Sequence, residues 1–291
     1  MNILKIDKLS KSFNGKTVID NLNLTVKKHT IYGFIGNNGT GKTTTMKTIL
    51  GLLKADSGEI EVCGQKVAFG NTNTNSCIGY LPDVPEFYGY MKAEEYLKLC
   101  AEITNISKEE RLPRIKELLE LVGLEREASK IKTYSRGMKQ RLGIAQALIN
   151  KPQLLICDEP TSALDPQGRS EILNILKRIT VETTVIFSTH ILSDVERICD
   201  TAGILHKGNV VKEINLHESL GDKGIMMELS AEELKVLGDE LELTPVSESK
   251  YRVENQPLQN IYKVLQDKGV YPESIVREKR SLEDVYMEVT S

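Results

Sequence analysis

The stretch GNNGTGKTTT, residues 36–45, fits the spacing G-x-x-x-x-G-K-[ST] of a phosphate-binding loop. It follows the apolar run TIYGFIG and precedes a segment of helical period, which is the context that such a loop requires. The glycines let successive backbone N–H groups point at phosphates, Lys42 adds a positive charge, and the hydroxyl of Thr43 suits Mg²⁺. We therefore predict a nucleoside triphosphate site with contacts from Asn38, Gly39, Thr40, Gly41, Lys42, Thr43 and Thr44.

Two adjacent acids, Asp158 and Glu159, follow the apolar run QLLIC of residues 153–157. In parallel α/β sheets, ligands bind beyond the carboxyl ends of the strands. Asp158 suits Mg²⁺, directly or through a water molecule, and Glu159 can polarise or deprotonate the attacking water. Such a pair alone usually marks a solvated turn, but its place after a phosphate loop favours the catalytic interpretation.

His190 ends the next apolar run, TTVIFSTH of residues 183–190. Its imidazole could reach the γ-phosphate or the attacking water. A single histidine at a strand end is more often a helix cap or a surface residue. Its position one strand after the two acids favours the site, so we predict Lys42, Glu159 and His190 as catalytic residues.

Short apolar runs that alternate with longer segments of helical period predict an α/β core with a mostly parallel sheet. Before the first run, the period-two pattern of residues 2–13 and 16–28, extended by 58–64, predicts an antiparallel β-subdomain. Between residues 91 and 122 two amphipathic patterns predict a helical insert. The predicted apolar faces are Ala93, Tyr96, Leu97, Cys100 and Ile103 on one helix and Leu112, Ile115, Leu118, Leu119 and Val122 on the other.

From about Leu216 the chain is richer in Glu and Lys and carries no nucleotide motif. We expect a strand over 224–229, a hairpin over 241–253, a helix over 258–266, a strand over 273–278 and a last helix from Leu282. The predicted fold is a P-loop NTPase core of α/β class over residues 1–216, with a helical subdomain at about 84–150. A small α+β domain over 217–291 follows it.

Composition limits the remaining possibilities. A net charge of −3 gives no support for a nucleic-acid surface, and five scattered cysteines do not fit a disulfide framework or a zinc site. No apolar run approaches the roughly 18 residues that span a bilayer. We expect a cytoplasmic protein that would need another protein to hold it at a membrane.

As a set, the motifs of this chain resemble those of the ATP-binding subunits of ABC transporters. The set consists of the phosphate loop, the helical insert, YSRGMKQR of residues 134–141, LLICDEPTSALD of residues 154–165, and His190. The resemblance covers about residues 1–216. It implies that two such subunits, as a homodimer or a paired assembly, stack head to tail. Each ATP with Mg²⁺ would then lie between one phosphate loop and the partner's signature loop, with Ser135 and Gly137 as contacts.

The same resemblance assigns two further residues. Phe13 matches the aromatic residue that stacks on adenine, although a core phenylalanine is an equal alternative. Asp165 matches the residue that couples the two sites, whereas Pro166 beside it could simply start a helix.

Two positions depart from the family pattern. Asp83 stands where most members have a metal-contacting glutamine, so we expect a contact with Mg²⁺ through water, or else a simple turn before Pro85. In the signature, usually LSGGQ, Arg136 replaces a glycine. Whether its guanidinium reaches nucleotide, the partner subunit or water is left open by the sequence.

The last residues, RSLEDVYMEVTS, resemble the tail of bacterial type-two exporter ATPases, including exporters of bacitracin and lantibiotics, although any amphipathic closing helix fits them. The resemblance implies an ATPase that powers export through a separate integral membrane permease. It would be peripheral on the inner face of the cell membrane. A soluble ABC-type ATPase acting on ribosomes or nucleic acid is the alternative, but a single nucleotide domain without a basic stripe disfavours it.

Overall fold

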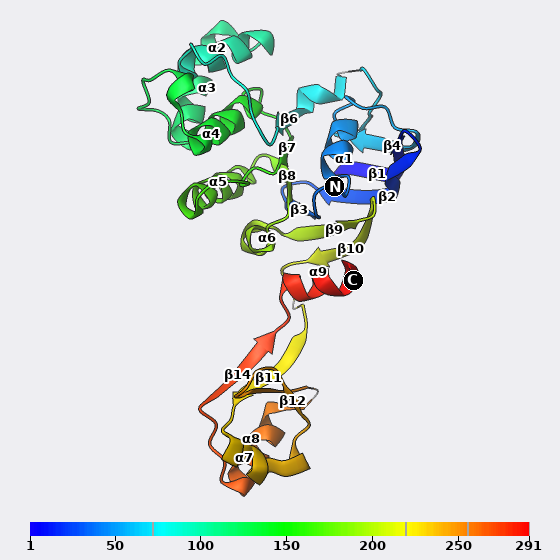
Figure 1. Ribbon diagram of the computed structural model, residues 1–291. Helices are drawn as coiled ribbons and strands as arrows, with labels where there is room; N and C mark the ends of the chain where they lie inside the picture. Colours follow the sequence, from blue (N-terminus) through cyan, green and yellow to red (C-terminus); the bar gives the residue numbers. More distant parts are fainter. Residues whose placement is uncertain (72, 219, 255, 291) are drawn as a thin grey trace. The chain divides into compact units, whose positions relative to one another are not determined.

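The computed structural model describes residues 1–71, 73–218, 220–254 and 256–290 (Figure 1). Ser291, the end of the predicted second domain, lies outside the described residues. The chain forms two compact units, Met1–Leu216 and His217–Ser291. In the described ranges, no helix combines the length and the apolar character that crossing a bilayer requires.

A six-stranded sheet forms the centre of the first unit, in the order β10-β9-β3-β8-β7-β6. Its strands pair in parallel except at the β9–β10 edge, which confirms the prediction of a mostly parallel sheet. Every residue of β3, β7 and β8 is buried, as expected for the central strands of a sheet that is covered on both faces. The strands are β3 (Ile31–Ile35), β6 (Ile78–Leu81), β7 (Leu154–Asp158), β8 (Thr184–Thr189), β9 (Thr201–His206) and β10 (Asn209–Asn215).

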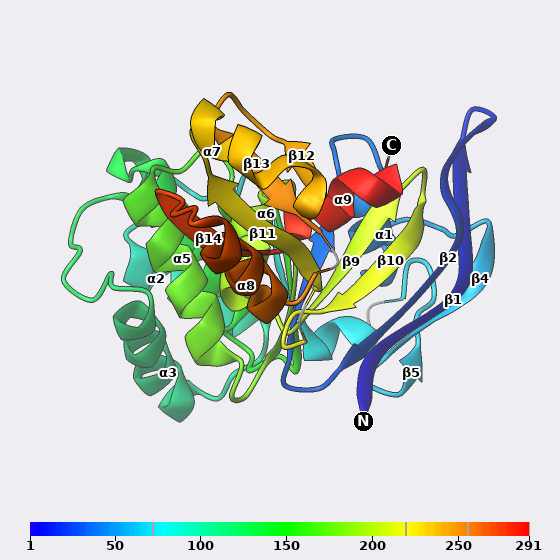
Figure 2. The ribbon, with the colours of Figure 1, turned by 90° about the horizontal axis from the view of Figure 1, so that it is seen from below.

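A second, antiparallel sheet lies at one end of the first unit, and α2, α3 and α5 lie at the other end (Figure 2). Its inward residues, such as Leu4, Ile6 and Leu24, join one apolar core with Phe34 and Ile156 of the parallel sheet. The predicted antiparallel β-subdomain is therefore confirmed. Its strands, in the order β2-β1-β4-β5, are β1 (Asn2–Phe13), β2 (Lys16–Lys27), β4 (Ser57–Val62) and β5 (Gln65–Lys66).

The predicted helical insert is present between β6 and β7. Its helices bury Tyr96 and Leu97 on one side and Ile115 and Leu118 on the other. The prediction that Ile103 and Leu112 lie on buried apolar faces is wrong, because both side chains are exposed. Ile103 is the last residue of its helix, and Leu112 lies near the start of the next helix. The helices of the first unit are α1 (Lys42–Ile49), α2 (Ala93–Ile103), α3 (Lys108–Leu121), α4 (Arg136–Ala147), α5 (Pro166–Ile179) and α6 (Leu192–Ile198), with 3₁₀ turns η1 (Asn73–Cys77) and η2 (Ile131–Thr133).

The second unit is an antiparallel sheet, in the order β12-β13-β11-β14, whose apolar residues form a core of their own with two helices. The predicted hairpin is present as β12 paired with β13. Helix α7 was not predicted, although Ser230 and Glu233 form the capping box that signals its start. The elements are β11 (Asp222–Glu228), α7 (Ala231–Leu237), the 3₁₀ turn η3 (Gly238–Glu240), β12 (Leu243–Pro245), β13 (Lys250–Val253), α8 (Leu258–Lys268), β14 (Ser274–Lys279) and α9 (Leu282–Thr290).

Candidate active site

The phosphate loop connects the end of β3 to the start of α1. Gly41 ends the loop with φ of 107°, and a Cβ atom there would lie 2.8 Å from the carbonyl oxygen of Val18. Only glycine fits this left-handed, crowded position. Lys42 then begins the helix, so the uncapped N–H groups of the first turn face the same side as the loop. This arrangement is an anion site of the kind that the sequence predicts.

The oxygen atoms that could hold a cation meet at the adjoining ends of α1 and β7. Thr43 Oγ1 donates a hydrogen bond of 2.7 Å to Asp158 Oδ2. Asp158 Oδ1 accepts a second hydrogen bond, also 2.7 Å, from the hydroxyl of Ser188. Because β7 and β8 are parallel with Asp158 opposite Ser188, the strand register fixes this contact. The buried Asp158 carboxylate is therefore oriented by hydroxyl groups on both sides.

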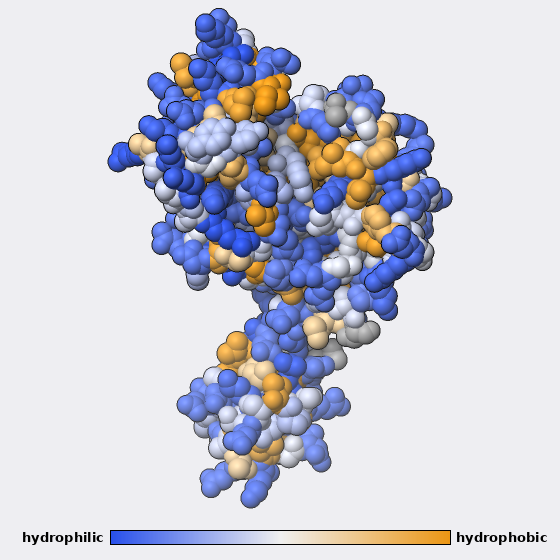
Figure 3. All heavy atoms as spheres, turned by 45° about the horizontal axis from the view of Figure 1, so that its top comes forward, coloured by the Kyte–Doolittle hydropathy of each residue, from blue (hydrophilic) through white to orange (hydrophobic). Residues whose placement is uncertain are grey.

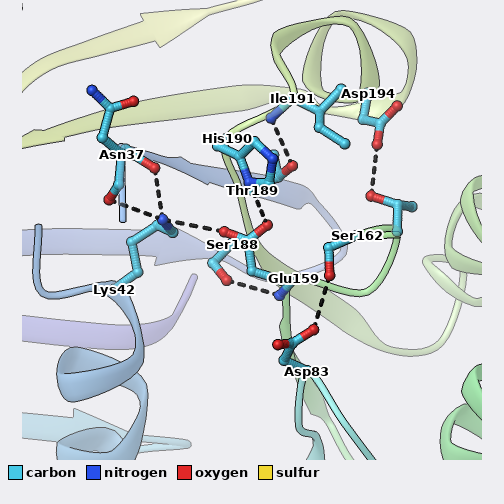
Figure 4. A network of polar contacts seen from close by, with 12 residues as sticks. Asn37, Lys42, Asp83, Glu159, Ser162, Ser188, Thr189, His190, Ile191 and Asp194 are labelled. Atoms are coloured by element: carbon cyan, nitrogen blue, oxygen red, sulfur yellow. Dashed lines mark hydrogen bonds and ion pairs between the residues drawn. The ribbon is translucent and has the colours of Figure 1, made fainter. Parts of the chain in front are cut away.

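Three charged or titratable side chains meet at Glu159, the residue that follows Asp158 (Figure 4). Lys42 Nζ lies 3.2 Å from Glu159 Oε1, and His190 Nδ1 lies 2.9 Å from Glu159 Oε2. Lys42 also donates to the carbonyl oxygens of Gly36 and Asn37 at 2.6 and 3.2 Å. The structure thus brings together the three residues predicted as catalytic, from α1 and from the ends of β7 and β8.

The backbone of Glu159 adopts an unusual conformation. Its φ of 49° lies in the left-handed region, which costs a non-glycine residue about 1 kcal/mol or more. Its N–H donates to Ser188 Oγ at 3.0 Å, so the same hydroxyl orients both Asp158 and Glu159. Strain of this kind persists where surrounding contacts over-determine a site, and here it directs the Glu159 side chain toward Lys42 and His190.

Ser188 was not singled out from the sequence, although a signal was available. It occupies the position on β8 that parallel register places opposite Asp158 on β7. The signal is its polarity, because a hydroxyl that directly follows the apolar residues 185–187 of a buried strand needs a buried hydrogen-bond partner.

The segment after Glu159 is held from two directions. Thr161 Oγ1 donates to the buried Asp194 of α6 at 2.7 Å, and Arg169 of α5 donates to the same carboxylate at 2.6 Å. Asp165 caps α5 by accepting from the N–H of Gly168 at 2.9 Å, with Pro166 as the first helical residue. The prediction of a helix start at Pro166 is therefore confirmed, and any coupling role of Asp165 is additional to it.

The signature segment starts α4. Ser135 is its N-cap and accepts from the N–H of Met138 at 3.2 Å. Gly137 stands in the first turn, where a Cβ atom would lie 4.0 Å from Leu164 Cδ2. An open groove of about 390 Å³ runs between this helix start and the start of α5. Two helix N-termini therefore face one groove, and no residue of the phosphate loop is among the described residues that line it.

The structure shows that Phe13 is an exposed residue and that Asp83 contacts Ser162. Phe13, at the end of β1, is 42% exposed, with the Lys11 ammonium 5.2 Å from its ring centroid, so the core alternative is wrong. Asp83 contacts neither Thr43 nor Asp158 through any hydrogen bond of the described residues. Its carboxylate accepts instead from the hydroxyl of Ser162 at 2.8 Å.

Known proteins resemble this chain along nearly its whole length. A family model described as ABC transporter matches residues 19–162. The uncharacterized ABC transporter ATP-binding protein YhcH of Bacillus subtilis (strain 168) is 36% identical over 298 residues, which cover 99% of this chain and 96% of YhcH. The chain belongs to the ABC transporter ATP-binding proteins.

Other members of this family resemble about three quarters of the chain. The bacitracin transport ATP-binding protein BcrA of Bacillus licheniformis is 43% identical over 215 residues, covering 73% of this chain and 69% of BcrA. The ATP-binding cassette MJ0796, solved as a dimer in a post-hydrolysis state with ADP and Pi, superposes with a TM-score of 0.66 at 26% identity over 73% of this chain and 98% of its own. This ABC transporter ATP-binding protein accordingly binds ATP and is an ATPase.

The role of Ser188 in this ABC ATPase can be tested by Ser188→Ala. The substitution removes the hydroxyl that contacts Asp158 Oδ1 and the Glu159 N–H, so both acids lose their orientation. We expect the turnover number to fall about 10- to 100-fold, as for other groups that orient a metal-binding side chain, with the KM for ATP little changed. Steady-state ATPase assays over a range of Mg²⁺ concentrations measure both quantities.

Ser76→Ala is the matched control, because that residue is exposed and its hydroxyl donates to the nearby carbonyl of Asn73. Parental turnover and an unchanged Mg²⁺ dependence in Ser188→Ala would show that the hydroxyl does not orient the two acids.

Proposed function

We propose that this chain is the ATP-hydrolysing subunit of an exporter, which uses ATP-driven head-to-tail dimerisation to move antibiotic peptides or other drugs. The observation that supports it best is the meeting of Lys42, Glu159 and His190 beside the Thr43–Asp158 pair. A phosphate-binding loop, a cation position and a candidate base with an oriented partner are the parts that phosphoryl transfer to water requires.

In this proposal Glu159 is the general base and His190 positions it. A base must lie within hydrogen-bond reach of the proton that it accepts, and the short Glu159–His190 contact holds one carboxylate oxygen while the other faces Lys42. Lys42 is only 6% exposed, so solvent screens its positive charge little. This charge is available to the β- and γ-phosphates. The imidazole is about half exposed, so it can also contact the γ-phosphate.

The residues present fit Mg²⁺. The hydroxyl of Thr43 and the carboxylate of Asp158 are adjacent hard oxygen ligands, while no cluster of three or more His, Cys, Asp or Glu within the described ranges could hold a metal alone. Such a donor set suits a cation that shares its coordination with phosphates and water. When bound, Mg²⁺ would neutralise charge on the β- and γ-phosphates.

A dimer would complete the site. The start of α4, with Ser135 and Gly137, is a positive helix end that lines a groove in which Lys42 takes no part. It would meet the γ-phosphate held by a second copy or a paired subunit, with Asp165 beside it. Phe13 would stack on the adenine, for which its exposed ring is suited. The dimeric form of MJ0796 supports this arrangement.

An exposed aromatic surface on the helical insert supports a membrane partner. The ring centroids of Tyr88 and Tyr90 lie 5.9 Å apart, and both rings are exposed together with Val84, while Tyr96 beneath them is buried. Figure 3 shows apolar side chains gathered over parts of the first unit within a largely hydrophilic surface. We assign the exposed surface of Val84, Tyr88 and Tyr90 as the binding site for a cytoplasmic helix of a separate permease. The permease would hold the protein on the inner face of the cell membrane.

The likeness to BcrA supports a peptide antibiotic as the transported substance. The alternative is a soluble ATPase that acts on ribosomes or nucleic acid. No observation favours it, because a net charge of −3 gives no support for a basic surface that binds nucleic acid.

Glu159→Gln tests the catalytic proposal. The amide keeps the shape of the side chain but cannot accept a proton, so we expect turnover to fall about 10²- to 10³-fold while ATP affinity changes little. The variant should form an ATP-dependent dimer, measured by light scattering on a size-exclusion column. Glu182→Gln, an exposed acid in the loop before β8, is the control. Parental turnover in Glu159→Gln would mean that another group is the base.

Substitution of the aromatic surface tests the partner. We expect Tyr88→Ser with Tyr90→Ser to abolish co-purification of an integral membrane protein from detergent-solubilised native membranes, because both exposed rings are lost. ATPase activity of the isolated subunit should stay within about twofold, because the proposed site at Lys42 and Glu159 does not use either ring. Tyr271→Ser, an exposed ring of the second unit, is the control. Undiminished capture of the same membrane protein would contradict the assignment.

A further inference from the structure

The two departures from the family pattern contact one another. Arg136 Nη2 lies 3.5 Å from Asp83 Oδ1, although the two residues are 53 positions apart. Here each charge has the other as its counter-ion, and the pair is about half exposed, at 46% and 48%.

The same carboxylate oxygen also holds the segment that follows Glu159. Ser162 Oγ donates to Asp83 Oδ1 at 2.8 Å (Figure 4). One atom therefore connects the start of α4 with the 159–165 loop. That loop is fixed on its other side by the contact of Thr161 with Asp194. A change in the position of Asp83 is thereby transmitted to both segments at once.

The backbone at Asp83 is held independently of its side chain. Gln140 Nε2, on the second turn of α4, donates to the carbonyl oxygen of Asp83 at 2.6 Å, and Gln140 is only 1% exposed. A substitution of the Asp83 side chain leaves this anchor in place. The fold of the segment after β6 therefore does not depend on the carboxylate, whereas the contacts with Ser162 and Arg136 do.

We propose that Asp83 and Arg136 are a matched pair of positioning residues that fix the signature helix against the 159–165 loop for ATP hydrolysis. The inference rests on the proposed role of Ser135 and Asp165 at the partner's nucleotide. Asp83 acts through its contacts with Ser162 and Arg136.

Charge balance explains why the two residues must change together. Asp83→Gln alone leaves the Arg136 guanidinium without its counter-charge and sets an amide of greater length against it. Arg136→Gly alone leaves a carboxylate without its counter-charge beside a helix start that must receive phosphate, where like charges repel. With both substitutions neither charge remains, and the amide oxygen introduced by Asp83→Gln can still accept from Ser162.

A double-mutant cycle tests the pair through ATP turnover. The variants are Asp83→Gln, Arg136→Gly and the double substitution, compared at low and high salt. We expect each single change to lower the turnover number about three- to fivefold with the KM for ATP little changed, and the double change to recover to within about twofold of the parent. Raising the ionic strength should shrink this coupling, because the pair is half exposed. Arg136→Lys, which keeps the charge, should retain most of the turnover.

A control cycle uses Glu102 and Arg111, an ion pair of 3.0 Å in the helical insert, away from both segments, and should show no coupling in turnover. Independent, multiplicative effects of Asp83→Gln and Arg136→Gly, or a coupling that salt does not alter, would overturn the proposal. Its failure is distinct from failure of the exporter proposal, because the cycle uses only the ATPase activity of the isolated chain. Circular dichroism checks that each variant is folded.

Discussion

The hydrogen bond between the Thr43 hydroxyl and the Asp158 carboxylate is the contact on which the site depends. It joins the first turn of α1 to the carboxyl end of β7, two segments separated by 115 positions. It forms because β3, β8 and β7 are parallel neighbours, so that their carboxyl ends lie at one edge of the sheet. The phosphate loop, the two acids and His190 all take their positions from this edge.

Charge is concentrated at this edge, and the structure balances it locally. Glu159 is adjacent to a buried Asp158, which would be unfavourable for two acids without compensation. Ser188 and Thr43 donate to Asp158, while Lys42 and His190 contact Glu159. The two carboxylates thus have separate partners, as the proposed roles of Asp158 in cation binding and of Glu159 in water activation require. A further balanced pair, Asp83 with Arg136, extends the same principle to the signature helix.

The sequence predicted the features that local pattern determines. The buried runs of β3, β7 and β8 and the glycine spacing of the loop were enough to bring Lys42, Glu159 and His190 to one edge. Contacts that depend on side-chain direction across long separations were not accessible, such as Asp83 with Ser162, 79 positions apart. The helical pattern also failed to predict that Ile103 is exposed. Ile103 is the last residue of α2, and periodicity alone does not show where a helix ends or where its packing against neighbours stops.

The proposed function requires Thr43 and Asp158 to hold the divalent cation that accompanies ATP. Electron paramagnetic resonance of Mn²⁺ titrated into the ATP-bound protein measures this directly, with Thr43→Val and Asp158→Asn as variants of nearly unchanged size. We expect Mn²⁺ affinity to fall about 10- to 100-fold in both variants, while metal-free ATP binding stays within about twofold. Parental Mn²⁺ affinity in both variants would contradict this role, because the cation would then have to be held elsewhere.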